Sequence, residues 1–410
     1  MPPTSSPGAH NSSSSLWSPA TPRHHMPSIG EMRRLSAGRR LGTTLCAMVL
    51  MAAPLTACSS DDQGKHSATS QTTASSDSPL ASAQGFILTQ QDLEKVKSDA
   101  GAVAKIRQAS SKLGNYTPHA VAELNLPDHY TSTGTDEESD QGSQDLARDA
   151  NAAYVKALSY LVTGNTDDAG QAQRVLDEWA TTLQNVGTVQ GKNALNFNGP
   201  YLLAAATWVR GVGGWDDSTF AAFTRDQLVP NAELTHPNNH GQWGILLVAS
   251  SGIFLNDLSL VTRARTQWLK AVPQEIAPDG TLPTEMTRSS TSDYHGGPTK
   301  GQRGIAYTHY ALLPMSVAAQ IFDVASNPVW DSDGGQRMGK ALGVVAGWVN
   351  DPKSFPYYAS NDGKLPDLHN DGYFALLLRH YPNAIAQQVL EQSAPEGDRF
   401  WLATLFPVER

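Results

Sequence analysis

Cysteine and positive charge are both scarce in this chain. Its 410 residues contain 2 cysteines, which excludes a disulfide-stapled scaffold and a cysteine-rich zinc site. Its 30 lysines and arginines stand against 39 aspartates and glutamates, so the formal net charge is −9. General nucleic-acid binding needs a basic surface, and this composition therefore argues against nucleic acid as a partner. A polyanionic substrate would require cations gathered at one site.

Alternating strand patterns are nearly absent from residue 86 onward, where helical periodicity recurs instead. In 145–162 apolar residues follow the helical period, and Gly164 provides a stop signal. Similar segments occur at 166–183, 200–212, 218–228, 242–254, 258–272, 302–322, 336–349 and 371–378. Helices of this length, joined by loops rich in Gly, Pro and Asn, predict one all-α domain over 86–410 built from antiparallel helix pairs.

Residues 1–57 have the features of an export signal. Four arginines between positions 33 and 40 precede the apolar segment 41–54, which is too short to remain as a membrane-spanning helix. Met26 and Met32 are alternative starts. The signal ends in Leu-Thr-Ala-Cys, which resembles a bacterial lipobox and predicts that Cys58 carries a lipid. The alternative is an ordinary signal peptide whose cleavage site happens to contain cysteine.

Residues 58–85 differ from the rest of the chain in composition. They are rich in Ser, Thr, Ala and Gln and predict a flexible tether with a reach on the order of 30 Å. We therefore expect an exported protein that Cys58 anchors at the outer face of a bacterial cell membrane. With an ordinary signal, the protein would be extracellular or periplasmic.

Three polar segments of the helical domain suggest chemistry. The first, 236–243, carries two histidines and two asparagines just ahead of an apolar helix, where the helix dipole favours an anion. The alternative is a capping role for Asn238 or Asn239, with His240 facing solvent. The second, 279–288, begins with an Asp-Gly turn and holds Glu285 and Arg288, which could also form a mere surface ion pair.

The third segment, 300–314, combines cations with phenols. If it is helical, Lys300, Arg303, Tyr307 and Tyr310 fall on one face. Two nearby cations favour the charged form of a phenol, which would lower the pKa of Tyr307 from its usual value of about 10 and make it a base. The alternative is a solvated face on which Lys and Arg stems cover the rings. His309 points elsewhere and is predicted to be structural.

Together these segments resemble the alginate lyase family. The matching patterns are Asn-Asn-His-Gly-x-Trp at 238–243, Asp-Gly-x-Leu-Pro-x-Glu-x-x-Arg at 279–288, and a basic residue seven positions before the first Tyr of Tyr-x-x-Tyr-Ala-Leu at 307–312. The similarity is strongest to the poly(β-D-mannuronate) lyases, and it covers 145–325 in order. It implies an (α/α) toroid and an enzyme that cleaves an acidic polysaccharide, a polyuronate.

The resemblance also implies site residues. In that family the active site comes from the Asn-His pair of the first block and from an Arg and a Tyr of the third. Carried over, these are Asn239, His240, a cation at Lys300 or Arg303, and Tyr307. Further substrate contacts are expected from Asn238, Trp243, Glu285, Arg288 and Lys300.

Two departures from the family pattern concern the cation. The family usually has Arg seven residues before the tyrosine, where this chain has Lys300, and Lys lacks the bidentate fork that grips a carboxylate. The family's second and third blocks also run together, whereas here Ser289–Thr299 is inserted between them.

The residues suit β-elimination. The proton beside a uronate carboxylate becomes acidic once donors neutralise that carboxylate, and Asn239, His240 and a cation are suitable donors. Tyr307 can take the proton and return it to the leaving oxygen on the same face; for opposite faces, His240 is the base and Tyr307 the acid. No metal or cofactor is expected, because the one pair of histidines four positions apart, His236 and His240, lies in the loop ahead of the apolar helix and not on one helix face.

Two other functions are compatible with the sequence. A glycoside hydrolase on the same toroid would use two carboxylates, with Glu285 paired to Asp279 or Asp293. A lipid-anchored polysaccharide-binding protein that has lost activity is the non-enzymatic alternative.

Overall fold

The computed structural model describes residues 80–126, 137–291, 293–392 and 398–408. In these ranges the regular structure is helical, and the β-structure is one isolated bridge between Glu123 and Asn185. The export signal, most of the tether and Cys58 lie outside the described residues. No helix within the described ranges is both long and apolar enough to cross a bilayer.

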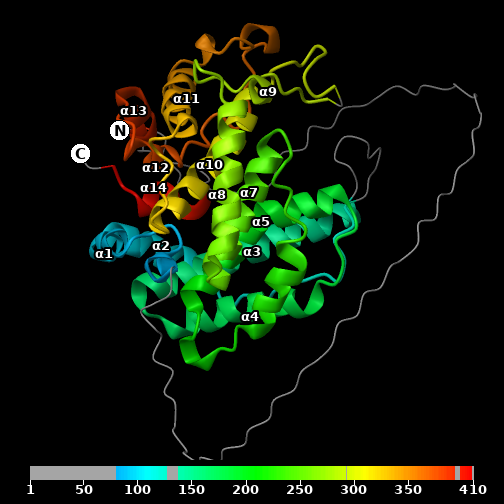
Figure 1. Cartoon of the computed structure of the whole chain (residues 1–410), viewed down its shortest axis with the longest axis vertical. Coiled ribbons are helices and arrows are strands. Elements are labelled where there is room, and N and C mark those ends of the chain that lie inside the picture. Colours follow the sequence, from blue (N-terminus) through cyan, green and yellow to red (C-terminus); the bar gives the residue numbers. More distant parts are fainter. Residues whose placement is uncertain (1–79, 127–136, 292, 393–397, 409–410) are drawn as a thin grey trace, which may run out of the picture. The chain divides into compact units, whose positions relative to one another are not determined.

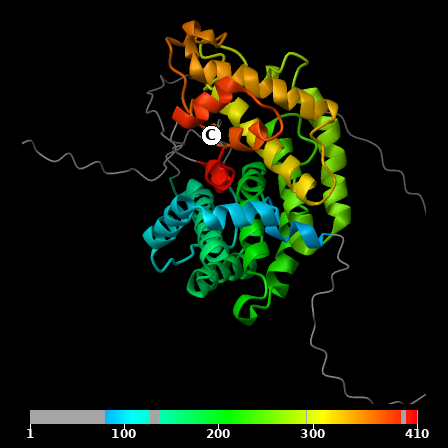
Figure 2. The ribbon, with the colours of Figure 1, turned by 90° about the vertical axis from the view of Figure 1, so that its left-hand side faces the viewer.

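The helices form two layers (Figure 1). The inner helices pack in the order α3 (Glu137–Thr163), α5 (Val189–Val209), α7 (Asn239–Leu255) and α10 (Gly304–Val324). The outer helices α2 (Ala100–Leu113), α4 (Thr166–Thr182), α8 (Leu258–Glu275) and α11 (Asp333–Asn350) lie against them. Figure 2 shows α8 and α11 running outside α7 and α10. The remaining helices are α1 (Gln90–Ser98), α6 (Ser218–Phe223), α9 (Pro283–Met286), α12 (Phe374–Leu378), α13 (Ala384–Gln392) and α14 (Leu402–Leu405).

Composition explains which helices are inside. In α7, in α10 and in the 202–209 half of α5 nearly every residue is buried, as expected of helical segments that are apolar all round. In α8 the buried residues Val261, Ala264, Trp268 and Val272 form a single stripe, and the other side faces solvent. This alternation of an amphipathic helix with a buried partner is the predicted arrangement of antiparallel pairs.

The folded domain begins earlier than predicted. Residues 81–85 form a short 3-10 helix, preceded by the fully buried Leu80. Phe86 is also fully buried, and Trp208 Nε1 donates to the Gly85 carbonyl (3.1 Å). The predicted boundary at residue 86 is therefore wrong by at least six residues, because Leu80 and Ala83 supply apolar surface to the core.

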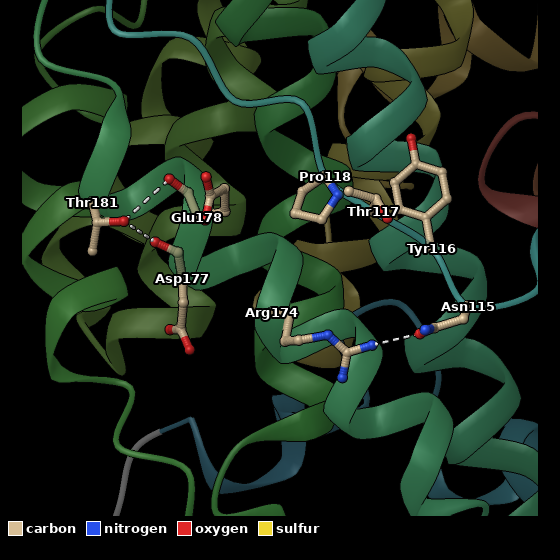
Figure 3. Close-up of a pocket in the computed structure, with 8 residues that line it drawn as sticks. All are labelled: Asn115, Tyr116, Thr117, Pro118, Arg174, Asp177, Glu178 and Thr181. Atoms are coloured by element: carbon tan, nitrogen blue, oxygen red, sulfur yellow. Dashed lines mark hydrogen bonds between the residues drawn. The ribbon is translucent and has the colours of Figure 1, made fainter.

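A polar pocket of about 590 Å³ lies between α4 and residues 115–118, which follow α2 (Figure 3). Its lining includes Asn115, Tyr116, Arg174, Asp177, Glu178 and Thr181. Arg174 donates to Asn115 Oδ1 (3.1 Å), and two carboxylates share the same wall. This mixture of charges does not favour a polyanion.

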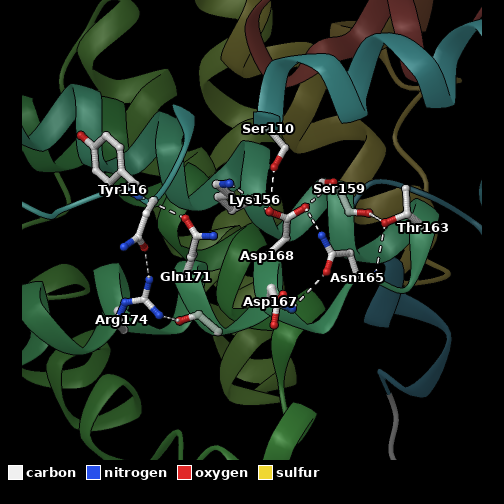
Figure 4. Close-up of polar contacts among 12 residues, drawn as sticks. Ser110, Tyr116, Lys156, Ser159, Thr163, Asn165, Asp167, Asp168, Gln171 and Arg174 are labelled. Carbon is white, nitrogen blue, oxygen red and sulfur yellow. Dashed lines mark hydrogen bonds and ion pairs between the residues drawn. The ribbon is translucent and has the colours of Figure 1, made fainter. Parts of the chain in front are cut away.

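A buried ion pair fixes the outer helices to α3 (Figure 4). Asp168 on α4 accepts hydrogen bonds from Lys156 (2.9 Å), Ser110 (2.8 Å), Ser159 (2.7 Å) and Asn165 (3.0 Å). Burial raises the pKa of this carboxyl, but the bonds from Ser159, Lys156 and Ser110 outweigh it, so the pKa is lowered. Four donors compensate the desolvated charge, which makes this network structural.

Candidate active site

Asn239 stands at the first turn of α7 and is tied to α9. Its backbone N–H and its Nδ2 both donate to Glu285 Oε1, at 2.8 and 3.1 Å. Glu285 is 2% exposed, and burial raises its pKa although the bonds from Asn239 and the charge of Arg288 lower it. The capping role belongs to Asn238, whose Oδ1 accepts from His240 N–H (3.0 Å). Asn239 and His240 are therefore not needed as caps.

His240 is held from α5 by Asn193. Asn193 Nδ2 donates to Gln190 Oε1 (3.2 Å), which turns Asn193 Oδ1 toward His240 Nδ1 (2.9 Å). Nδ1 then carries the proton, and Nε2 is an acceptor. Burial, helped by the charges of His236 and Arg288, lowers the pKa of His240 to about 4. The imidazole is consequently neutral at neutral pH.

Arg288 supplies the cation at Tyr307. Its guanidinium carbon lies 4.3 Å from the centroid of the Tyr307 ring, and its charge acts on both His240 and Glu285. The side chain is 6% exposed. Amide, imidazole, guanidinium and phenol thus come together from the starts of α7 and α10 and from the segment after α9.

The predicted stripe of Lys300, Arg303, Tyr307 and Tyr310 is wrong, because α10 begins only at Gly304. Gly301 has φ 77°, a left-handed conformation that ends any helix. Its N–H donates to the Thr287 carbonyl (3.1 Å), and Arg303 N–H donates to the Arg288 carbonyl (3.0 Å). Residues 301–303 therefore form backbone hydrogen bonds with residues 287 and 288, just after α9, and are not part of a helix.

The two cations of that segment face elsewhere. Lys300 Nζ lies 5.6 Å from the Tyr357 ring centroid, and Arg303 pairs with Asp367 (3.5 Å). Arg288 takes the position at Tyr307 that was expected of Lys300 or Arg303. Tyr307 and Tyr310 do remain neighbours on α10, with ring centroids 6.4 Å apart.

Burial changes the expected role of two other residues. Trp243 is fully buried, donates from Nε1 to the Tyr310 carbonyl (3.1 Å) and packs on the Tyr310 ring. It holds α7 against α10 and does not present a ring to a polymer. Glu285 likewise holds Asn239 and is buried away from solvent. The polar atoms that these two side chains use are engaged with protein partners, so we assign neither of them a substrate contact.

The carboxylate pair of the hydrolase alternative gains no support. Asp279 accepts from the N–H (2.9 Å) and hydroxyl (2.8 Å) of Thr281 in an exposed turn. Glu285 is committed to Asn239 in the interior. Two carboxylates that flank a glycosidic bond would both have to face the substrate. Within the described residues, no group of three or more His, Cys, Asp or Glu side chains could hold a metal ion.

Asn193 was missed by sequence reasoning. It is one of three asparagines in the 193–198 stretch of α5, although Asn is a poor helix former. That enrichment is the signal that could have indicated a polar role. Its partner, however, is 47 positions away and becomes visible only in the folded chain.

His309 is structural, as predicted. The ring is fully buried, with Nε2 donating to the Leu368 carbonyl (3.1 Å) and Nδ1 accepting from the Tyr373 hydroxyl (3.1 Å). Burial lowers its pKa to about 4 despite the opposing bond to Leu368.

This burial predicts a loss of stability in mild acid. Because the pKa in the folded chain lies below the unfolded value, stability is present above the unfolded pKa and is lost as the pH falls toward the folded one. Between about pH 7 and pH 5, His309 should account for about 2 kcal/mol of lost unfolding free energy. Urea unfolding of His309→Gln should show a correspondingly weaker pH dependence than the wild type. An equal dependence in both proteins would contradict the neutral, buried ring.

The described part of the chain is a helical toroid in which Asn239, His240, Arg288 and Tyr307 cluster near the starts of two inner helices. A toroid with such a polar cluster is the architecture of a polysaccharide-processing protein. A sequence model described as "Alginate lyase" matches residues 67–355, which is more than half of the chain. The chain therefore belongs to the alginate lyase family.

Two curated relatives are an alginate lyase of Azotobacter chroococcum mcd 1 and one of Pseudomonas fluorescens. The first is 26% identical over 236 residues, which cover 54% of this chain and 60% of that protein. The second is 31% identical over 157 residues, which cover 37% of this chain and 38% of that protein. The chain thus spans 60% or less of the length of these relatives.

Solved structures agree on the fold. An alginate lyase from Bacteroides ovatus has a TM-score of 0.59 at 15% identity, covering 79% of this chain and 99% of that one. Alginate lyase A1-III from Sphingomonas species A1 has a TM-score of 0.59 at 15% identity, covering 82% and 98%. At these identities the likeness concerns the fold, and it confirms the predicted (α/α) toroid.

Proposed function

We propose that the chain is a polysaccharide lyase that cleaves a 4-linked polyuronate, such as the polymannuronate of alginate, by β-elimination. The observation that carries the proposal is the contact of the buried Arg288 guanidinium with the ring of Tyr307, beside a neutral His240. A cation next to a phenol and an unprotonated imidazole suits the removal of a proton from the carbon beside a carboxylate.

Arg288 and Asn239 would neutralise the substrate carboxylate. The Arg288 guanidinium offers a planar fork of N–H groups that matches two carboxylate oxygens. Asn239 is fully buried and uses one Nδ2 hydrogen on Glu285, which orients the amide; its second Nδ2 hydrogen is the one proposed to reach the substrate carboxylate. His240 was also expected to donate, but Nδ1 is engaged with Asn193 and Nε2 is an acceptor. Its proposed role is therefore that of a base or of a partner to a hydroxyl.

Tyr307 and His240 would move the proton. The base takes the hydrogen on C5, a double bond forms between C4 and C5, and the C4–O bond breaks. The departing oxygen then receives a proton from an acid. When both events occur on one face of the sugar, Tyr307 serves as base and acid; when they occur on opposite faces, His240 Nε2 is the base and Tyr307 the acid.

A panel of polyuronates tests this function. The full chain is incubated with polymannuronate, polyguluronate and polyglucuronate, and the ultraviolet absorbance of the conjugated unsaturated uronate is followed. We expect absorbance to rise with at least one polymer. New reducing ends without absorbance would favour a hydrolase, and binding without product would favour a binding protein.

We further propose that the protein is exported and anchored by a lipid on Cys58, facing its substrate outside the cell. The basic stretch, the short apolar segment and the lipobox-like Leu-Thr-Ala-Cys support this localisation. Cys58→Ser should abolish incorporation of a labelled fatty acid and release the protein or leave it unprocessed. Metabolic labelling in the producing bacterium measures this, and equal label in both proteins would contradict the lipid anchor.

A further inference from the structure

The inserted segment between Arg288 and α10 folds back beside Arg288. Ser289 N–H donates to the Tyr294 carbonyl (2.8 Å), and the Ser289 hydroxyl lies 2.6 Å from that of Thr299. The Thr287 hydroxyl lies 3.0 Å from His295 Nδ1. These bonds join the two ends of the loop, and they fix the position of Tyr294 relative to Arg288.

Tyr294 places a second aromatic ring on the same guanidinium. Its ring centroid is 4.9 Å from the guanidinium carbon of Arg288, while that of Tyr307 is at 4.3 Å. Arg288 is 6% exposed, whereas Tyr294 is 38% exposed. Tyr307 belongs to the inner helix α10, and Tyr294 therefore forms the solvent-side wall of the arginine.

We infer that Tyr294 is a positioning residue that orients Arg288 for the uronate carboxylate; this rests on the proposed lyase function. Rings pack against the faces of a guanidinium and leave the N–H groups at its edge for hydrogen bonds. A carboxylate must then approach that edge, in the bidentate geometry.

Holding Arg288 in place with Tyr294 should raise kcat more than it strengthens substrate binding. As the C5 proton leaves, negative charge on the carboxylate grows, and a preorganised cation stabilises the transition state more than the bound substrate. A freely moving Arg288 could still bind the polymer but would have to reorient during the reaction.

The test compares two replacements that differ in their π-system. Tyr294→Phe keeps the ring, while Tyr294→Leu keeps apolar bulk and removes the ring. In the full chain acting on polyuronate, Tyr294→Leu should lower kcat by roughly threefold to thirtyfold, the span of a cation–π contact, with KM within about twofold. Tyr294→Phe should stay within about twofold of the wild-type kcat. His295→Ala removes a bond that closes the loop but keeps the Tyr294 ring, so its kcat should fall by less than that of Tyr294→Leu, and the melting temperatures of the variants should agree.

Three kinetic outcomes would overturn the inference. Tyr294→Leu could be as active as the wild type, Tyr294→Phe could lose as much as Tyr294→Leu, or KM could rise for long polymers only. The last would make the exposed ring a stacking surface for a sugar. Absence of unsaturated product from the wild type would overturn the proposed function instead.

A second measurement does not depend on activity. The rate at which phenylglyoxal modifies Arg288, followed by mass spectrometry of the peptide, reports how well Tyr294 covers the guanidinium. The rate should be several-fold higher in Tyr294→Leu than in the wild type and in Tyr294→Phe. Equal rates in all three proteins would show that Tyr294 does not hold Arg288.

Discussion

Arg288→Ala is expected to lower the turnover of polyuronate by about 10²–10³-fold, the usual loss for one preorganised donor to a developing negative charge. Arg288 contacts the Tyr307 ring and acts on His240, so its removal leaves the substrate carboxylate without its cation. Arg288→Lys should recover part of the loss, because a point charge remains without the bidentate fork. Turnover is measured per folded molecule, since a buried side chain is being removed.

Lys300→Ala and Arg303→Ala are the matched controls. Both remove a cation from the same stretch of chain, but Lys300 lies against Tyr357 and Arg303 pairs with Asp367. Each should retain turnover within about tenfold of the wild type, far above the loss expected at Arg288. A hundredfold loss of turnover in either control, with little loss in Arg288→Ala, would show that Lys300 or Arg303 supplies the cation, as the sequence predicted.

Tyr307→Phe should lower turnover by about 10²–10⁴-fold, the scale of a positioned acid or base. The replacement keeps the ring and its contact with Arg288 and removes only the hydroxyl. Stability should fall by about 1 kcal/mol at most, the contribution of one hydrogen bond. Binding of the polymer should survive, because Arg288 and Asn239 remain.

Steady-state kinetics, a binding isotherm and a melting curve together check this result. Tyr310→Phe is the control, because Tyr310 lies one turn on and its ring is packed against Trp243. A Tyr307→Phe protein that cleaves polyuronate at nearly the wild-type rate would assign the proton transfer to another group.

Much of the fold could be predicted because helical periodicity is a local property. The segment 242–254 became α7 (Asn239–Leu255), and 258–272 became α8 (Leu258–Glu275). Where local signals were weaker, the prediction failed. The segment 371–378 is helical only from Phe374, whereas 218–228 is helical throughout, as an α-helix to Phe223 and a π-helix over Thr224–Leu228. The buried Leu80 extended the domain because a single apolar side chain in a polar stretch gives no periodic signal.

The site was predictable only where its residues are close in sequence. Asn239 and His240 follow from a helix start that carries polar side chains. The cation at Tyr307 was assigned to Lys300 or Arg303 and not to Arg288, because spacing to Tyr307 was counted along the chain. Backbone bonds from Gly301 and Arg303 instead bring the chain back to residues 287 and 288. The pairing of Asn193 with His240 depends on the packing of α5 against α7, which no local pattern reveals.

Whether oxygen from water enters the products at the cleaved bond tests the proposed chemistry most directly. The full chain is incubated with polymannuronate in water labelled with heavy oxygen, and the oligosaccharide products are weighed by mass spectrometry. Elimination adds no water at the cleaved bond, so each new non-reducing end is an unsaturated uronate that is lighter by one water than the product of hydrolysis and carries no heavy oxygen. Products with a saturated non-reducing end, which together gain one labelled water at each cleavage, would show hydrolysis and would contradict the roles proposed for Arg288, His240 and Tyr307.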